Sequence, residues 1–214
     1  SCPGDGGDIM LIENRLIAYT LLALLVALVV SFLMTPIVKT FAYKVGAIDV
    51  PKDARRMHKT PIPRLGGLAI FIGFMVSILL FVEITAEMRS ILLGAVIIVV
   101  LGVVDDIMAL PAKLKFVIQI VAALIPALNG VSIQALSNPN IFSPNAYWVL
   151  NWLSVPVTVL WIVGITNAVN LIDGLDGLAN GVSAISAATV LVIALICSRS
   201  EEHTSELQSL RHLV

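Results

Sequence analysis

The chain has 214 residues, of which 58% are hydrophobic and only 13% are charged, and its formal net charge is −1. A soluble domain normally carries about a quarter charged residues, and here the mean hydropathy is +1.00. The composition therefore excludes an ordinary soluble domain and predicts an all-α, polytopic integral membrane protein with no nucleic-acid partner.

Six apolar stretches follow one another along the chain, and we interpret each as a transmembrane helix. A span needs about 20 mostly apolar residues, so the short second, third and fourth stretches require little tilt. The six spans are expected near residues 16–38, 66–82, 88–104, 114–128, 148–166 and 178–197.

The two ends of the chain differ from this apolar body. Residues 1–9 are rich in Gly and Asp and precede Met10, whereas residues 198–214 change abruptly to Ser, Glu, His and Leu. We expect one transmembrane domain over 10–197, a non-native head over 1–9, and a foreign polar tail over 198–214, with a short amphipathic tail as the alternative. Cys2 and Cys197 form no metal-type or disulfide spacing.

The basic residues predict how the spans are oriented. Seven of the thirteen Lys and Arg residues fall between 39 and 64, and positive loops stay in the cytoplasm. Six alternating spans then place residues 105–115 and 167–180 on that same face, and residues 83–87 and 129–147 outside. Three polar segments are thus expected to converge on the cytoplasmic face.

Adjacent carboxylates, Asp105 and Asp106, stand at the end of the third expected span. Like charges at close range raise the pKa of one group unless a cation lies nearby, so the pair is expected to hold a divalent ion or, through it, a phosphate; solvated capping of the membrane exit is the alternative. Lys113 and Lys115 follow within about three helical turns. Lys115 is assigned to a substrate phosphate, and Lys113 equally to phosphate or to lipid headgroups.

The loop before the second span combines basic residues with turn residues. Lys59 and Arg64 are expected to attract nucleotide phosphates, although positive charge at this interface also serves topology and lipid anchoring. Pro61 and Pro63, with the glycine pair 66–67, indicate a defined turn into the span. His58 carries no assigned role.

The most informative segment reads Asn-Ala-Val-Asn-Leu-Ile-Asp-Gly-Leu-Asp-Gly, from 167 to 177. Asn167, Asn170, Asp173 and Asp176 recur every third residue, so on a helical path they drift slowly around one side. Polar groups at the edge of a span need a partner such as a metal, a phosphate or a proton path. Oxygen donors without Cys or His favour Mg²⁺ or Mn²⁺.

Together these motifs resemble the polyprenyl-phosphate N-acetylhexosamine-1-phosphate transferases. The resemblance rests on Asp49-Val50-Pro51 through Arg64-Leu65-Gly66-Gly67, on Asp105-Asp106 with Lys115, and on the Asn167–Gly177 motif. It covers residues 15–197. The His-Lys-x-Pro-x-Pro-Arg-Leu-Gly-Gly loop is most similar to the branch that uses UDP-N-acetylglucosamine, and the muramoyl-pentapeptide branch ranks second.

The resemblance implies a bacterial plasma-membrane enzyme with a cytoplasmic active face. It implies Mg²⁺-dependent transfer of N-acetylglucosamine 1-phosphate from UDP-N-acetylglucosamine to undecaprenyl phosphate, with release of UMP, as the first step of a surface polymer or teichoic acid. Catalytic roles fall to Asp105, Asp106, Asp173 and Asp176, and metal binding to Asn170 and Asp173. Substrate binding falls to Lys115, Lys113, Asn167, Lys59 and Arg64. A homodimer is left open.

One departure from the family pattern qualifies this expectation. A later Gly-Asp-x-Gly-Ser type motif and a histidine-rich loop do not occur in this chain, so it is interpreted as an N-terminal fragment whose activity alone is in doubt. A transporter piece or inactive membrane fragment is the alternative of another class. Because the carboxylates lie at expected span ends rather than in mid-membrane, surface chemistry is favoured over transport.

Overall fold

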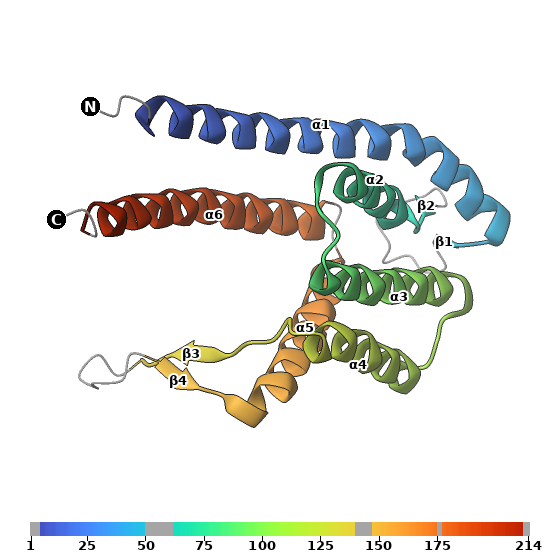
Figure 1. The fold of residues 1–214 in the computed structure, drawn as a ribbon. Coiled ribbons are helices and arrows are strands. Elements are labelled where there is room, and N and C mark those ends of the chain that lie inside the picture. Colours follow the sequence, from blue (N-terminus) through green and yellow to red (C-terminus); the bar gives the residue numbers. More distant parts are fainter. Residues whose placement is uncertain (1–4, 50–61, 140–146, 175–176, 212–214) are drawn as a thin grey trace. The chain divides into compact units, whose positions relative to one another are not determined.

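The structure is a computed structural model that describes residues 5–49, 62–139, 147–174 and 177–211. Six α-helices make up most of this part of the chain (Figure 1). They are α1 (Asp5–Val45), α2 (Gly66–Phe81), α3 (Ala86–Met108), α4 (Ala112–Leu128), α5 (Ser154–Ile172) and α6 (Leu178–Arg211). Each expected span corresponds to one helix, which confirms the all-α prediction.

Two short antiparallel strand pairs interrupt the helices. Between α1 and α2, β1 (Ile48–Asp49) pairs with β2 (Ile62–Pro63), and Ile48 lies opposite Pro63. Between α4 and α5, β3 (Ala135–Ser137) pairs with β4 (Tyr147–Val149), followed by the 3₁₀ turn η1 (Asn151–Leu153). The fifth helix therefore begins later than expected, because Tyr147, Trp148 and Val149 are residue types that favour strands.

The helices have the character of membrane helices. Among the described residues, four helical stretches are long and apolar enough to cross a membrane, and α2 is a shorter apolar helix. Their large apolar side chains are mostly exposed, for example Phe32 at 75% and Leu160 at 73%. Exposed apolar side chains over whole helices are expected where lipid rather than water surrounds the protein. The chain is an integral membrane protein.

The chain divides into two compact units, residues 1–160 and 161–214. In the first unit, a small core joins α1, the β1–β2 pair and α2 through Val38, Ala42, Ala47, Leu65 and Ala69. Val103 of α3 packs against this core. The core therefore fixes the base of the loop between β1 and β2 next to the C-terminal part of α3.

Small residues allow the helices of the first unit to approach closely. A Cβ atom added at Gly73 of α2 would overlap the carbonyl oxygen of Ala27 in α1, and one at Gly94 of α3 would lie 2.8 Å from the carbonyl oxygen of Ala122 in α4. Ser77 Oγ donates a hydrogen bond to the carbonyl oxygen of Ala23 at 2.8 Å. Close backbone packing and interhelical hydrogen bonds are what hold helices together in lipid.

In the second unit, α6 continues from Leu178 to Arg211, through the segment expected to be a separate tail. At the other end of the chain, α1 begins at Asp5, within the expected head. Ala179 is buried, whereas the rest of α6 up to Cys197 is exposed. The described part of this unit thus lacks the close helix packing seen between α1 and α2.

Candidate functional site

The turn between α3 and α4 is built around Asp105. Asp105 lies in the last turn of α3, and its carbonyl oxygen accepts from the backbone N–H of Ala109 at 2.8 Å. Ala109 has a φ of 49°, the left-handed conformation that commonly ends helices. The side-chain Oδ1 of Asp105 then accepts from the backbone N–H of Leu110 at 2.9 Å. One carboxylate oxygen therefore fixes the backbone that leads into α4.

The second carboxylate oxygen of Asp105 holds Lys115. Lys115 Nζ lies 3.1 Å from Asp105 Oδ2, and the two side chains are 31% and 30% exposed. An ion pair at this exposure contributes at most about 1 kcal/mol, so its main effect is to position the ammonium group. Lys115 is in the first turn of α4, which contains no acidic residue. The sequence predicted both residues as part of the site, and the structure shows that they are in contact.

The other candidates at this turn differ in exposure. Asp106 is half-buried, and Lys113 is exposed. Because Asp105 and Asp106 are consecutive on a helix, their side chains point about 100° apart. Asp105 stabilises the turn through its two contacts, with Leu110 and Lys115, and the shared binding of an ion by Asp105 and Asp106 stays a prediction.

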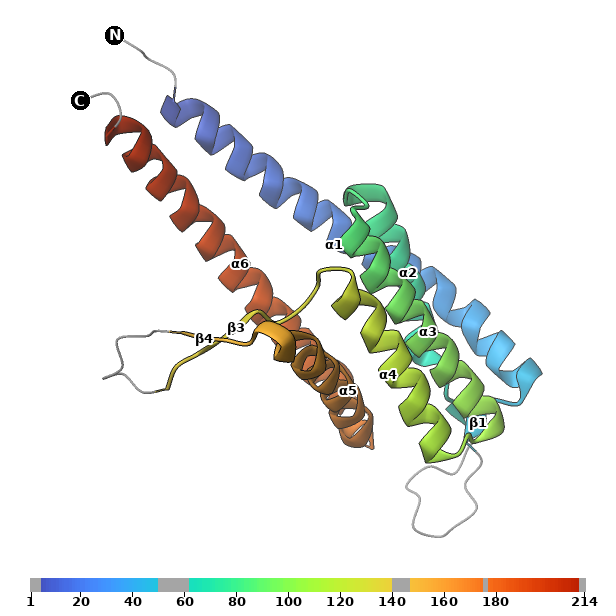
Figure 2. The same ribbon diagram turned by 60° about the horizontal axis from the view of Figure 1, so that its bottom comes forward.

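The basic loop is anchored at the same end of the first unit. The backbone N–H of Arg64 donates to the carbonyl oxygen of Ala47 at 3.0 Å, and the side chain of Arg64 is exposed. Figure 2 shows β1 beside the turn between α3 and α4, in agreement with the packing of Val103 on the shared core. Lys59 lies outside the described residues. The structure thus brings Arg64 to the same end as Asp105, Asp106 and Lys115.

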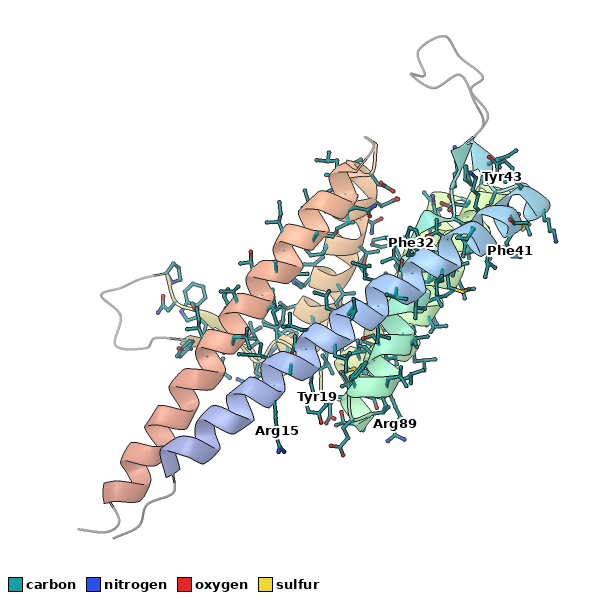
Figure 3. The ribbon with its side chains drawn as sticks, turned by 90° about the horizontal axis from the view of Figure 1, so that it is seen from above. Arg15, Tyr19, Phe32, Phe41, Tyr43 and Arg89 are labelled. Atoms are coloured by element: carbon teal, nitrogen blue, oxygen red, sulfur yellow. The ribbon has the colours of Figure 1, made fainter. Side chains whose placement is uncertain are left out.

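The distribution of other labelled residues marks the two ends of this unit. In Figure 3, Tyr43 and Phe41 lie toward one end of α1, while Arg15 and Tyr19 lie toward the other, on the same side as Arg89 in the first turn of α3. The basic residues Lys39, Lys44 and Arg64 belong to segments at the Tyr43 end. More positive charge therefore gathers at the end that carries the two carboxylates.

The Asn/Asp motif belongs to the second unit. Asn167 Nδ2 donates to the carbonyl oxygen of Val163 at 2.8 Å within α5. Asn170 is exposed near the end of α5, and Asp173 is exposed in the turn just beyond it. The helical path predicted for this motif is confirmed for Asn167 and Asn170 and ends before Asp173, and Asp176 lies outside the described residues.

Glycine shapes the chain after this turn. Gly177 has a φ of +79°, where side chains are rarely accommodated, and its carbonyl oxygen accepts from the N–H of Gly181 at 2.8 Å. Gly177 therefore redirects the chain into α6. The convergence of this motif with the Asp105 turn stays a prediction.

The described oxygen donors suit a divalent metal that keeps part of its water shell. In the part of the chain that the structure describes, no three His, Cys, Asp or Glu residues cluster as a metal site. Mg²⁺, however, usually binds one or two protein groups and completes its shell with water and substrate phosphates. Exposed carboxylate and carboxamide oxygens, as at Asp173 and Asn170, fit this mode of binding. The described residues do not form a site that encloses the ion with protein ligands alone.

Sequence reasoning missed the dependence of the α3–α4 turn on Asp105. The signal was present: Ala109-Leu110-Pro111 predicts a helix end, since the residue before proline avoids the helical conformation. A carboxylate one turn earlier is able to accept from the freed backbone N–H groups. Asp105 thus combines a structural role with its candidate chemical role.

Comparison with known proteins gives a consistent result. The profile of the family described as "Glycosyl transferase family 4" matches residues 88–210. The chain is 44% identical over 188 residues to the "Probable undecaprenyl-phosphate N-acetylglucosaminyl 1-phosphate transferase" of Bacillus subtilis, covering 86% of this chain and 51% of that protein.

Two more distant relatives carry names that describe related transfer reactions. A "Decaprenyl-phosphate N-acetylglucosaminephosphotransferase" of Mycobacterium tuberculosis is 32% identical, over 54% of this chain and 30% of its own length. A "Phospho-N-acetylmuramoyl-pentapeptide-transferase" of Wolbachia pipientis is 30% identical, over 55% of this chain and 39% of its own. The chain thus spans about half the length, or less, of these relatives. No solved structure matches it.

Proposed function

Because the chain belongs to glycosyl transferase family 4, we propose that it forms part of an enzyme that transfers N-acetylglucosamine 1-phosphate from UDP-N-acetylglucosamine to undecaprenyl phosphate. An oxygen of the lipid phosphate attacks the β-phosphorus of the nucleotide sugar. The bond from that phosphorus to the bridging oxygen breaks, and UMP leaves with that oxygen. The observation that carries the proposal is the charged turn of Asp105, Asp106 and Lys115 at the end of an apolar helix.

The residues at this turn suit a reaction between phosphates. Lys115, held by Asp105, supplies positive charge at a fixed place, and Lys113 and Arg64 add further charge at the same end of the unit. In phosphoryl transfer, positioning and charge stabilisation do most of the work. Asp106, the residue after Asp105 on α3, is assigned to orienting the lipid phosphate, and Lys115 and Lys113 to binding phosphate oxygens.

The Asn/Asp motif is assigned to the nucleotide and a metal. Asn170 and Asp173 would hold Mg²⁺, with Mn²⁺ as the substitute, and Asp176 and Asn167 would assist with the nucleotide. When bound, the ion neutralises charge on the diphosphate as UMP departs. The exposure of Asn170 and Asp173 supports this assignment, because both side chains are open to a ligand.

The site is placed on the cytoplasmic side of the bacterial plasma membrane, with the chain crossing the membrane several times. This assignment is supported by the basic residues around 39–64 and by the apolar helices. A cytoplasmic site is also where a nucleotide sugar is available. The lipid product would begin the synthesis of a surface polymer or teichoic acid.

N-acetylglucosamine is preferred to N-acetylmuramoyl-pentapeptide as the transferred sugar. The Bacillus relative shares 44% identity over 86% of the chain, whereas the Wolbachia relative shares 30% over 55%. The muramoyl substrate is therefore the second candidate, and the same assay separates the two.

The test measures UMP release by membranes that contain either this chain or a chimera in which residues 1–197 replace the matching half of the Bacillus relative. We expect UMP release from the chimera that requires undecaprenyl phosphate and Mg²⁺, stops with EDTA, and is faster with UDP-N-acetylglucosamine than with UDP-N-acetylmuramoyl-pentapeptide. A membrane-inserted chimera that releases no lipid-dependent UMP with either sugar would contradict the proposal.

A further inference from the structure

The connection between α4 and α5 exposes an unusual set of apolar side chains. Tyr147, Trp148 and Val149 of β4 are 64%, 53% and 67% exposed, and Trp152 of η1 is 80% exposed. Leu136 of β3, opposite Trp148, is 42% exposed. These five side chains form the aromatic patch. Two of the three tryptophans of the chain belong to it.

Neither face of the β3–β4 pair is covered by the described part of the protein. Neighbouring residues on a strand point to opposite faces, and all three residues of each strand are exposed. Figures 1 and 2 agree that the two strands extend away from α4. A lone two-stranded pair is marginally stable in water. Its apolar side chains therefore call for a partner beyond the described residues.

The base of the strand pair is firmly fixed to α5. Ser154 Oγ donates to the carbonyl oxygen of Ile133 at 2.7 Å, and the backbone N–H of Ile133 donates to Thr158 Oγ1 at 2.8 Å. Ser154 and Thr158 are each only 4% exposed. The backbone N–H of Leu150 also donates to the carbonyl oxygen of Gln134 at 2.9 Å. The aromatic patch is thus held at the level where α5 begins.

That level coincides with a membrane boundary. Helix α4 has 17 residues and so spans about 26 Å, close to the roughly 30 Å of a bilayer core. Its first turn carries Lys113 and Lys115, which belong in water, so its last residue, Leu128, lies near the opposite boundary. The candidate span that contains α5 begins at Asn151, next to Trp152.

The composition of the surrounding sequence selects lipid as the partner. From Phe116 to Ile172 the chain contains no Asp, Glu, Lys, Arg or His. Exposed apolar side chains also follow along α5, where Leu160 and Trp161 are 73% and 62% exposed. Tyr and Trp, with an apolar body and one polar group, are the residues enriched at membrane–water interfaces.

We propose that the aromatic patch is an interfacial anchor that inserts into the headgroup layer of the bilayer, at the end of α4 opposite to Asp105. Its ligand is the phospholipid surface itself. The anchor fixes the depth of α4 and α5, and so holds the Asp105 end at the other boundary. This inference does not depend on the reaction proposed above.

The test uses depth-dependent fluorescence quenching in phosphatidylcholine vesicles. Three single-tryptophan variants are needed, each with two tryptophans changed to phenylalanine, so that Trp148, Trp152 or Trp161 remains. We expect Trp148 and Trp152 to be quenched more by lipids brominated near the headgroup than by lipids brominated near the chain end. Trp161, about two helical turns into α5, is the control and should show the reverse order.

Two outcomes would overturn the proposal. Strong quenching of Trp152 by aqueous iodide, without quenching by either brominated lipid, would place the aromatic patch in water. Protection from iodide and from both lipids would place it against protein, such as a second copy of this chain. In both cases a Trp161 that is quenched most by deep bromines confirms that the protein is inserted, so neither result is due to misfolding.

Discussion

The turns that follow α3 and α5 both carry polar side chains with oxygen donors, but they differ in how many of these side chains find a hydrogen-bond partner within the chain. After α3, both side-chain oxygens of Asp105 are occupied, one by the N–H of Leu110 and one by Lys115 Nζ. After α5, Asn170 and Asp173 are exposed, and neither side chain has a hydrogen-bond partner within the described residues. The first turn is stabilised internally, whereas the second keeps its oxygen donors open for a ligand.

The same contrast appears in the helices that lead to each turn. Gly73 and Gly94 lie against the backbone of a neighbouring helix, whereas a Cβ atom at Gly164 or Gly181 would meet nothing within 4 Å. At Gly73 and Gly94, small residues are thus required by packing. At Gly164 and Gly181, the described chain leaves space for a side chain.

The largest expected effect is on activity, from Asp173→Asn. If the open turn binds the metal and nucleotide, loss of its charge should lower UMP release by the chimera about 100-fold or more, as removal of one key electrostatic group does elsewhere. Because Asp173 is exposed and makes no described contact, membrane insertion and the thermal midpoint should not change. UMP release and thermal unfolding of the same preparation provide the measurement.

The control for this prediction is Asn180→Asp, which adds a carboxylate at an exposed position of α6. It should leave UMP release within about twofold, since surface substitutions away from special features usually change little. Normal turnover by Asp173→Asn would remove Asp173 from the site and would weaken the contrast between the two turns.

The second prediction compares Gly73→Ala with Gly164→Ala. The added methyl group at Gly73 overlaps the backbone of α1, and overpacking typically costs about 1–3 kcal/mol. At Gly164 the methyl group meets open space, so the better helix propensity of alanine should leave stability unchanged or raise it by up to about 1 kcal/mol. Thermal unfolding of the purified chain in one detergent measures both.

A loss of stability for Gly164→Ala equal to that for Gly73→Ala would show that the second unit is as closely packed as the first. The contrast between the two regions would then be wrong. Gly102→Ala, in the same helix as Gly94 but with open space around it, gives an independent control in the first unit.

Much of this fold follows from hydropathy, because apolar runs long enough for a bilayer have few other structures available. The second expected span, 66–82, matches α2 (Gly66–Phe81) closely. Helix ends were harder to predict: α3 continues to Met108 through Asp105 and Asp106. Hydropathy indicates where the lipid ends, whereas a helix ends where the backbone leaves the helical conformation, here at the left-handed Ala109.

The candidate site was predicted as a set of residues but not as a set of contacts. Asp105 and Lys115 were both identified, yet their ion pair depends on the angle of the turn at Ala109, which residue types alone do not give. The hydrogen bonds of Ser154 and Thr158 to Ile133 were not foreseen for the same reason, since they join residues more than 20 positions apart.

The third prediction separates the two roles of Asp105. A double-mutant cycle with Asp105→Asn and Lys115→Met should give a coupling of about 0.5–1 kcal/mol in unfolding free energy, because the pair is partly exposed and screened. Asp105→Ala should cost more than Asp105→Asn, since the amide oxygen of Asn still accepts from Leu110. Equal losses for Ala and Asn would show that the hydrogen bond to Leu110 contributes nothing.

The smallest expected effect tests the contrast at a single hydrogen bond. Ser77→Ala removes the bond to the carbonyl oxygen of Ala23 and should cost about 0.6 kcal/mol, the average for such bonds between membrane helices. Ser183→Ala, at an exposed position of α6, should cost nothing. Thermal midpoints in detergent, averaged over replicate series, measure this difference. If both variants lost stability equally, Ser183 would contact a partner beyond the described residues. The exposure of α6 would then not hold in the protein as purified.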